Sequence, residues 1–242
     1  MDRPGSARPA PRRQTGDLDI LYEDEFLMVL DKPAGLLSVP LERKRGASSA
    51  YDQLEDYFRS RGRRRPFVVH RIDRDTSGVV LFAKDGGTQA ALKSQFRRRE
   101  PERVYLAVVY GRPDPPSGTW RDRLVWDDKA LVQKATHGGD PDGTEAISDY
   151  RVIETFPATT LIEVRLQTGK RNQIRIQAQL RDHPLVGERR YVGSVAGGVA
   201  FPRQALHAHR LGFQHPADGR PMRFELPPPP DFLDLLARLR RR

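Results

Sequence analysis

Two carboxylates in a short polar segment are the residues of this chain best suited to do chemistry. Asp73 and Asp75 lie between the apolar runs 67–69 and 79–83, which have the length of strands. Buried strands on both sides would hold the polar segment in place, and Gly78 permits a sharp bend at its end. Two interpretations stay open from these residues alone. The segment is either a turn whose Asp, Thr and Ser side chains bond their own backbone, or the site of a positioned catalytic carboxylate.

The segment around these carboxylates resembles the signature of the RluA-type pseudouridine synthases. The residues that carry the resemblance are His70-Arg71-Ile72-Asp73 and then Thr76-Ser77-Gly78. The resemblance implies that Asp73 is the essential aspartate and that Arg71 fills the gap left in the RNA helix by a flipped-out base. It further implies that His70 and Thr76 contact the RNA and that Asp75 supports the turn.

An aromatic candidate lies on the strand-like run 103–111. The alternation of this run places Tyr105, Ala107 and Val109 on one face. A buried tyrosine on a strand is ordinarily packing. The sequence Arg103-Val104-Tyr105-Leu106-Ala107, however, resembles the second motif of the same family. The resemblance implies that the Tyr105 ring stacks on the target uracil and so compensates part of the lost base stacking.

A third segment, 168–176, resembles the family motif Thr-Gly-Arg followed by His-Gln-Ile-Arg. The positions that depart from the motif are Lys170, Asn172 and Gln177. The resemblance implies that Arg175 pairs with the catalytic aspartate, and it predicts that RNA is bound by Lys170, Arg171 and Gln173. We expect Thr168 and Gly169 to end a strand and the segment after them, to Arg181, to form a helix, which would place Arg171 and Arg175 one turn apart on the same side.

The reaction implied by the resemblance breaks the N1–C1′ bond of a uridine, turns the uracil and rejoins it through C5. Asp73 would act as an ionised carboxylate that either attacks C1′ or removes the 2′ proton, and both routes stay open. Desolvation would raise the pKa of this carboxyl group, whereas a guanidinium within about 4 to 6 Å favours its charged form. Arg175 would supply that charge. The chain has no Gly-rich nucleotide-binding loop and no redox motif, so no cofactor is expected.

Composition favours a polyanionic partner. The 242 residues carry a formal net charge of +10, and the resulting positive field attracts nucleic acid. The absence of cysteine excludes thiol redox chemistry and Cys-type zinc sites. His207 and His209 have a spacing that zinc sites use, but no third ligand is in view, so no metal is predicted. No apolar run approaches the roughly 18 to 20 residues of a membrane span, and a cytoplasmic monomer is expected.

The elements that must position these residues are short strands joined by turns, which favours an α+β fold with a mainly antiparallel sheet. The resemblance implies a long bent sheet with flanking helices and a central active-site cleft. Residues 1–16 are predicted to be a disordered basic tail and 17–242 the catalytic domain. The chain resembles compact members without an N-terminal S4-like RNA-binding domain, which implies a stem-loop of rRNA or tRNA as the partner.

Helices are expected over 51–58 and 88–99, and a last helix is expected to begin after a cap at Asp231. In the second of these, the residues expected to face inward are Ala91, Leu92 and Phe96. The basic run 59–65 between the first helix and the carboxylate segment is expected to contact phosphates.

Two rival functions remain. A catalytically silent RNA-binding or ribosome-assembly protein on the same fold predicts the loss of Asp73, Tyr105 or Arg175, and all three are present. A carboxylate-based nucleoside or glycoside hydrolase would need a second acid or base opposite Asp73, and Asp75 is very close in sequence for that role. The sequence therefore predicts an RNA pseudouridine synthase and leaves the RNA and the uridine open.

Overall fold

The computed structural model describes residues 13–16, 18–40, 48–62, 65–128, 130, 132–136, 140–192 and 198–241. Within these residues, one sheet of twelve strands is flanked by four helices. The strands are β1 (Arg13–Thr15), β2 (Leu18–Glu23), β3 (Leu27–Lys32), β4 (Phe67–Val68), β5 (Ser77–Ala83), β6 (Glu102–Tyr110), β7 (Ser117–Asp127), β8 (Val132–Thr136), β9 (Thr144–Thr155), β10 (Thr159–Leu166), β11 (Leu206–Gln214) and β12 (Pro221–Glu225). The helices are α1 (Ala50–Arg59), α2 (Gly86–Arg97), α3 (Gln173–Gln179) and α4 (Pro230–Arg240).

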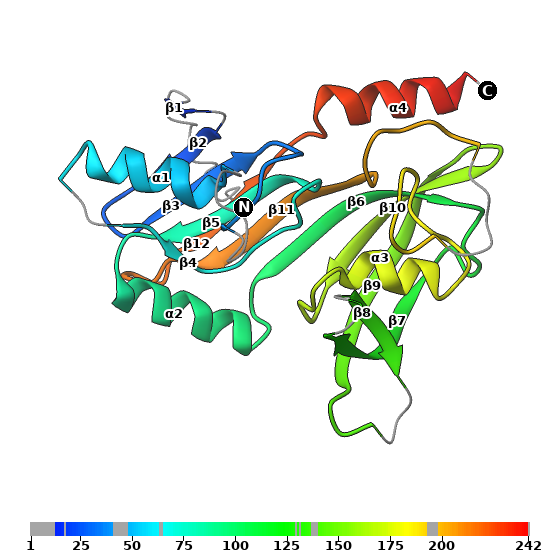
Figure 1. Ribbon diagram of the computed structural model, residues 1–242, viewed down its shortest axis with the longest axis horizontal. Helices are drawn as coiled ribbons and strands as arrows, with labels where there is room; N and C mark the ends of the chain where they lie inside the picture. The colour runs from blue at the N-terminus through cyan, green and yellow to red at the C-terminus, as the bar shows by residue number, and fades with distance from the viewer. Residues whose placement is uncertain are drawn as a thin grey trace, which may run out of the picture.

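The sheet is long, bent and mainly antiparallel (Figure 1), which confirms the predicted α+β fold. Its strands follow the order β1-β2-β3-β5-β11-β6-β10-β9-β7-β8. Among the described strands, β5 and β11 form the one parallel pair, near the middle of the sheet. Gly78 makes this pairing possible because a Cβ on it would lie 2.2 Å from the carbonyl oxygen of Ala208. Its φ of +116° is also one that glycine adopts readily.

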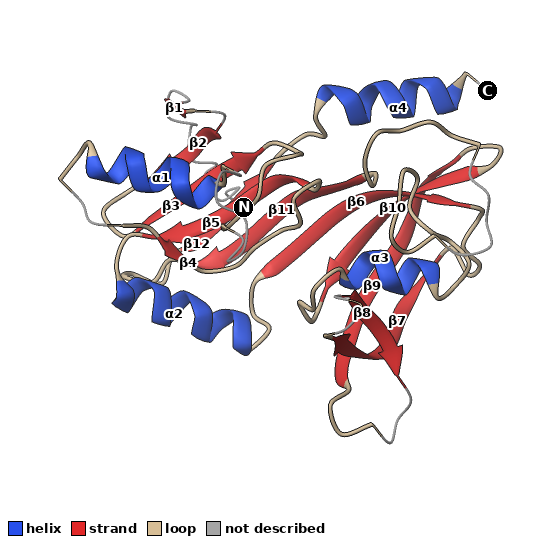
Figure 2. Cartoon of the chain, viewed as in Figure 1, coloured by secondary structure: helices blue, strands red, loops and turns tan. Residues whose placement is uncertain are grey.

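Helices cover both faces of the sheet (Figure 2). In the N-terminal half of the sheet, alternate side chains of β5 show how both faces are enclosed. Val80 and Phe82 pack in the cluster that holds the buried residues of α1. Val79 and Leu81 point to the other face and pack in the cluster that holds Leu92 of α2. Both neighbouring faces of β5 are therefore dry, and the strand is buried along its whole length.

The alternation of β6 organises the other half in the same way and confirms the predicted alternation. Tyr105, Ala107 and Val109 face the cluster that contains residues of α3. Val108 faces the opposite cluster, which contains the buried residues of α4. Helices α2 and α3 lie on the same face of the sheet, on either side of a gap that β6 crosses (Figure 1).

Several local predictions are confirmed and others are wrong in their limits. The helix expected over 51–58 is α1, and Ser49 caps it by accepting a hydrogen bond from the backbone N–H of Asp52. Helix α2 begins earlier than expected, at a cap formed by Asp85, and its Ala91 is exposed rather than buried. Asp231 does not cap α4, because the helix begins at Pro230 and the Asp231 carboxylate pairs with Arg203.

The predicted disordered tail is wrong for residues 13–15. They form β1, which pairs with β2 in antiparallel register from Arg13 opposite Ile20 to Thr15 opposite Leu18. The rest of the tail, residues 1–12, lies outside the described residues, as do residues 63–64 of the basic run predicted to contact phosphates.

Candidate active site

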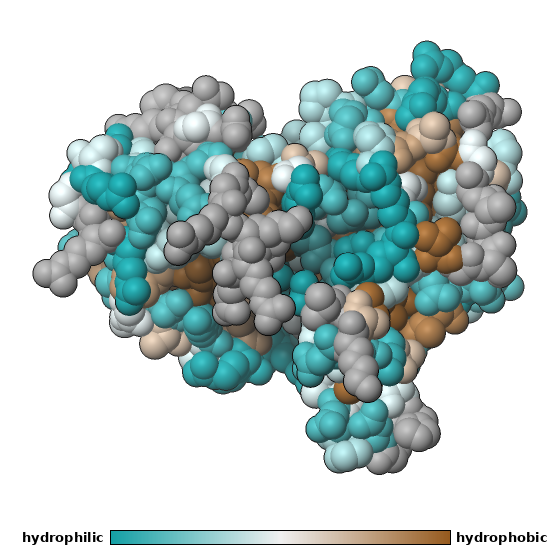
Figure 3. Space-filling view, viewed as in Figure 1, coloured by the Kyte–Doolittle hydropathy of each residue, from teal (hydrophilic) through white to brown (hydrophobic). Residues whose placement is uncertain are grey.

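A pocket of about 420 Å³ lies between α2 and α3, and all three segments singled out in the sequence line it. The loop 69–76 forms one wall, α2 closes one end, and the segment 166–175 forms the opposite wall. The space-filling view is hollowed between the two halves of the molecule, and hydrophilic residues gather along the hollow (Figure 3). Tyr105 and Arg103 of β6 also contribute to its lining.

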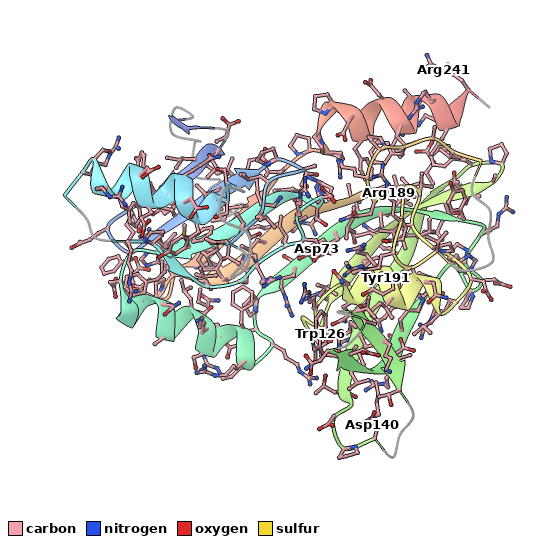
Figure 4. The ribbon with its side chains drawn as sticks, viewed as in Figure 1. Asp73, Trp126, Asp140, Arg189, Tyr191 and Arg241 are labelled. Atoms are coloured by element: carbon pink, nitrogen blue, oxygen red, sulfur yellow. The ribbon has the colours of Figure 1, made fainter. Side chains whose placement is uncertain are left out.

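Asp73 and Arg175 meet in this pocket, as the sequence predicts. Nη1 of Arg175 donates to Oδ2 of Asp73 over 3.2 Å. The Asp73 side chain is 24% exposed and that of Arg175 is 13% exposed, so the pair is reachable from solvent through the carboxylate. Asp73 projects from the loop between β4 and β5 toward the half of the molecule that carries Tyr191 and Trp126 (Figure 4).

Glu188, which the sequence analysis did not single out, fixes Arg175 in this position. Its two carboxylate oxygens accept from Nε and Nη2 of Arg175, each over 2.7 Å. The third guanidinium nitrogen is left to reach Asp73 and also donates to Oδ1 of Asn172. Asn172, a departure from the family motif, thus retains a contact with the key arginine.

The surroundings of the buried pair of Arg175 and Glu188 favour the charged form of both side chains. Burial alone would lower the pKa of Arg175, but its hydrogen bonds and ion pair with Glu188, and then the charge of Asp73, raise that pKa above its ordinary value. Burial likewise opposes the charge of Glu188, and hydrogen bonds from Arg175 and from the backbone at 190–191 lower its pKa. Asp73 therefore faces a permanent guanidinium charge.

Tyr105 forms part of the pocket floor and is 9% exposed. Burial, with a smaller effect of Asp73, raises the pKa of its hydroxyl to about 12, so the ring stays neutral. A neutral aromatic face beside a carboxylate can support a flat pyrimidine while the sugar lies near Asp73.

His70 and Thr76 line the pocket but their polar atoms are used within the protein. Nε2 of His70 accepts from the backbone N–H of Leu81, its ring stacks on Phe96, and burial lowers its pKa to about 3. Thr76 is 1% exposed and its hydroxyl accepts from Gln204. The structure thus gives both side chains a part in holding the loop.

A buried lysine secures the loop that carries Asp73. Lys32 is 0% exposed, and its ammonium group donates to the carbonyl oxygens of Pro33, Leu36 and Arg74. Burial lowers its pKa to about 7. The Lys-Pro-Ala-Gly step that begins at Lys32 therefore ties β3 to the residue that follows Asp73.

The turn before α3 differs from the prediction. The helix begins at Gln173 rather than directly after Gly169, because Asn172 has a left-handed backbone conformation with φ of 54°. Gln173 is 2% exposed, and its side-chain amide is fully used within the protein. The amide oxygen accepts from the Thr168 hydroxyl and the Lys170 N–H, and the amide nitrogen donates to Ile147 O and the Ser148 hydroxyl. Its role is therefore to shape the turn. Arg171 is therefore not one helical turn from Arg175.

The remaining predicted RNA-binding residues lie at or near the mouth of the pocket. Arg71 is exposed and lines the pocket together with Lys170. Arg171 is also exposed and lies over the Trp126 ring, 4.2 Å from its centroid. Burial, and then the nearby charge of Arg71, lower the pKa of Arg171. These cations are placed to meet a polyanion that enters the pocket.

Neither a metal site nor a membrane span is seen in the part of the chain that the structure describes. No group of three or more His, Asp or Glu side chains there could hold a metal ion. None of the described helices is long and apolar enough to cross a membrane.

The structure thus combines a mainly antiparallel sheet with a pocket that holds the Asp73–Arg175 ion pair and is lined by Tyr105. Comparison with known proteins identifies the class of enzyme. Residues 26–180 match the family model described as RNA pseudouridylate synthase, and the chain belongs to this family. It is accordingly an RNA pseudouridine synthase, an isomerase that converts uridine in RNA to pseudouridine.

Individual relatives agree with the family. The chain is 38% identical over 246 residues to Ribosomal large subunit pseudouridine synthase D of Xanthomonas campestris, covering 92% of this chain and 70% of the relative. It is 36% identical over 215 residues to Dual-specificity RNA pseudouridine synthase RluA of Escherichia coli K12, covering 87% and 93%. The structure of Human RNA Pseudouridylate Synthase Domain Containing 4 has the same fold, with a TM-score of 0.76, 22% identity, and coverage of 91% and 92%.

Proposed function

We propose that this synthase isomerises a uridine in a stem-loop of rRNA or tRNA and that Asp73 is its essential carboxylate. The observation that carries the proposal is the ion pair between Asp73 and Arg175 in a pocket floored by Tyr105. The names of the relatives, which include a ribosomal large subunit synthase and a dual-specificity synthase, support the choice of RNA.

The geometry gives each residue a step. The target uridine leaves its helix and its uracil stacks on Tyr105, while Arg71 takes the vacated place and offsets part of the cost of flipping. Lys170 and Arg171 bind phosphates at the mouth and supply salt-dependent affinity. Arg175, held by Glu188, places a fixed positive charge beside the Asp73 carboxylate.

Asp73 then opens the glycosidic bond by one of two routes. It either attacks C1′, forming an ester as the N1–C1′ bond breaks, or removes the 2′ proton as that bond breaks. In both routes the bonding electron pair leaves with the uracil. The turned uracil then forms the C5–C1′ bond. In the first route this breaks the ester bond and releases the Asp73 carboxylate, and in the second route Asp73 returns the proton to C2′. C5 finally loses its proton and N1 gains one, so atoms and electrons balance without an outside reagent.

The test is pseudouridine mapping with two matched variants. Total RNA from a strain that lacks this gene is incubated with wild type, Asp73→Asn or Asp75→Asn and mapped by carbodiimide-dependent reverse-transcription stops. Asp75 is a matched control because it lies two residues away, is 44% exposed at its side chain and pairs with Arg74 alone among described residues, over 3.8 Å.

We expect new stops in rRNA or tRNA with wild type and Asp75→Asn, and none with Asp73→Asn. New stops with Asp73→Asn at the wild-type rate would contradict the role of Asp73. Stops confined to other RNA classes would contradict the proposed substrate.

A further inference from the structure

Arg103 is a buried cation without an anionic partner among the described residues. The residue is 8% exposed, and its Nη2 donates to the carbonyl oxygens of Leu166 and Gln167 over 3.4 and 3.2 Å. Its Nε is buried and has no hydrogen-bond partner in the part of the chain that the structure describes. Burial lowers its pKa, and no carboxylate of the described residues forms an ion pair with it. Buried charges are normally paired, so the uncompensated guanidinium of Arg103 calls for an external partner.

The Arg103 side chain is held against the active pocket. It lies two residues before Tyr105 on the same face of β6, and both residues line the pocket with Asp73. The Phe96 ring of α2 lies 5.6 Å from the guanidinium carbon. On the other side, Nη1 occupies the space beside Gly169, where an added Cβ would lie 2.4 Å from it. Gly169 thus leaves room for this nitrogen at the pocket wall.

The depth of Arg103 selects its ligand within the substrate. The exposed cations at the mouth, Arg71 and Arg171, are those that a phosphate backbone meets first. A guanidinium that is almost fully covered and shares the strand face of Tyr105 is reached by the part of the nucleotide that enters furthest. That part is the base, and its hydrogen-bond acceptors are the carbonyl oxygens O2 and O4.

We propose that Arg103 binds a carbonyl oxygen of the target uracil and stabilises the negative charge that develops on it as the N1–C1′ bond breaks. The proposal rests on the proposed function, since it requires a uridine in this pocket. In both routes open to Asp73, the electron pair of the broken bond passes to N1 and is shared with O2 and O4. A fixed donor aimed at that oxygen in a dry site lowers the barrier, and the charge disappears when C5 bonds to C1′.

The experiment couples the arginine to single atoms of the substrate. Single-turnover rates and RNA dissociation constants are measured for wild type and Arg103→Met on a synthetic stem-loop that carries the mapped uridine. The same stem-loop is made with 2-thiouridine or 4-thiouridine at the target, or with a methylphosphonate at either flanking phosphate. Arg97→Met, which removes an exposed arginine of the same pocket, serves as the matched control.

We expect Arg103→Met to slow the chemical step about 10² to 10³-fold, the range for loss of one oxyanion donor, with RNA affinity little changed. Either 2-thiouridine or 4-thiouridine should lower the single-turnover rate of wild type and of Arg97→Met. The same substitution should not lower the rate of Arg103→Met any further. Gly169→Ala should displace Nη1 of Arg103 and so cause a smaller rate defect that is coupled to the same thio substitution. Thermal unfolding shows whether each variant is folded, and Gly169→Ala keeps the proposal testable if Arg103→Met is not.

Three outcomes would overturn the proposal. Independent, multiplicative effects of Arg103→Met and of both thio substitutions would exclude a uracil contact. Coupling to a methylphosphonate alone would make Arg103 a phosphate ligand. Failure of wild type to convert the unmodified stem-loop would overturn the proposed function itself, and is distinguished from the first two outcomes because they require an active wild type.

Discussion

Replacing Glu188 by glutamine removes one charge from the buried support of Arg175 and keeps the shape of the side chain. The Glu188 side chain is 1% exposed and receives two hydrogen bonds of 2.7 Å from Arg175. A glutamine retains one acceptor oxygen and turns an NH₂ group toward the guanidinium. A hydrogen bond to a charged group contributes about 1.5 to 3 kcal/mol. With one such bond lost, one weakened and Asp73 still paired, we expect a loss of about 2 to 4 kcal/mol in the free energy of unfolding at pH 7.

The pH dependence of this loss has a definite sign. Arg175 and backbone N–H groups lower the pKa of folded Glu188 below its ordinary value of 4.5, despite burial. The stabilisation is therefore present above pH 4.5 and is lost as the pH falls through the lower pKa of the folded state. Urea denaturation of wild type and Glu188→Gln should show a gap in unfolding free energy at pH 7 that narrows below about pH 4.5.

Activity should fall as well, because Arg175 is no longer held at a fixed angle to Asp73. A small misplacement of a catalytic group costs up to about 10²-fold, so we expect kcat to fall about 10 to 100-fold with RNA affinity retained. Glu145→Gln is the matched control, since Glu145 is 39% exposed in its pairs with Arg121 and Arg99 and should change stability by about 0.5 kcal/mol or less. A Glu188→Gln enzyme with wild-type kcat and stability would refute the reasoning.

Four further predictions concern the floor, the loop and the mouth of the pocket. Tyr105→Leu removes the stacking platform, worth about 1 to 3 kcal/mol per base, and should lower kcat/KM about 5 to 150-fold in a steady-state assay. The rate of Tyr105→Phe divided by the rate of wild type should not change between pH 7 and 10, because the pKa of Tyr105 is raised to about 12. Lys32→Met removes three hydrogen bonds and should cost about 3 kcal/mol by urea denaturation. The pKa of Lys32 is about 7 in the folded state against 10.5 in the unfolded state. Its contribution to the free energy of unfolding should therefore grow as the pH rises from 7 toward 10. A difference in unfolding free energy between Lys32→Met and wild type that does not change with pH would contradict this. Arg171→Ala should reduce the slope of log affinity against log salt by about 0.7 to 0.9, and an unchanged slope would remove Arg171 from the phosphate contacts.

Local periodicity of apolar residues was enough to predict many of the strands and helices. The alternation along β6 placed Tyr105 on the face that became the pocket floor, because side-chain direction on a strand depends on position alone. The position of Arg175 beside Asp73 came from the resemblance of two motifs, since no local pattern relates residues 102 positions apart in the chain. Periodicity therefore accounts for the elements, and the family motifs account for their meeting.

The residues that sequence reasoning passed over act through tertiary contacts. Glu188 belongs to a loop without periodicity, and only the folded chain shows that it grips Arg175. Lys32 is held by the carbonyl groups of Pro33 and Leu36, which follow β3, and of Arg74 in the Asp73 loop, and no local pattern predicts this meeting. The start of α3 was placed early because the left-handed backbone of Asn172 has no strong signal in an amino acid that is not glycine.

The parallel pairing of β5 with β11 governs the order in which the chain can fold during synthesis. β11 is inserted between β5 and β6, although its residues leave the ribosome long after both of those strands. Until then, each of the two strands has one edge without its native neighbour, and unpaired edges invite association between chains. Contacts this distant in sequence also slow folding. A nascent chain that ends before residue 206 therefore has the Asp73 loop and Tyr105 but not the strand that fixes one against the other, so catalytic competence is acquired only after β11 has been made.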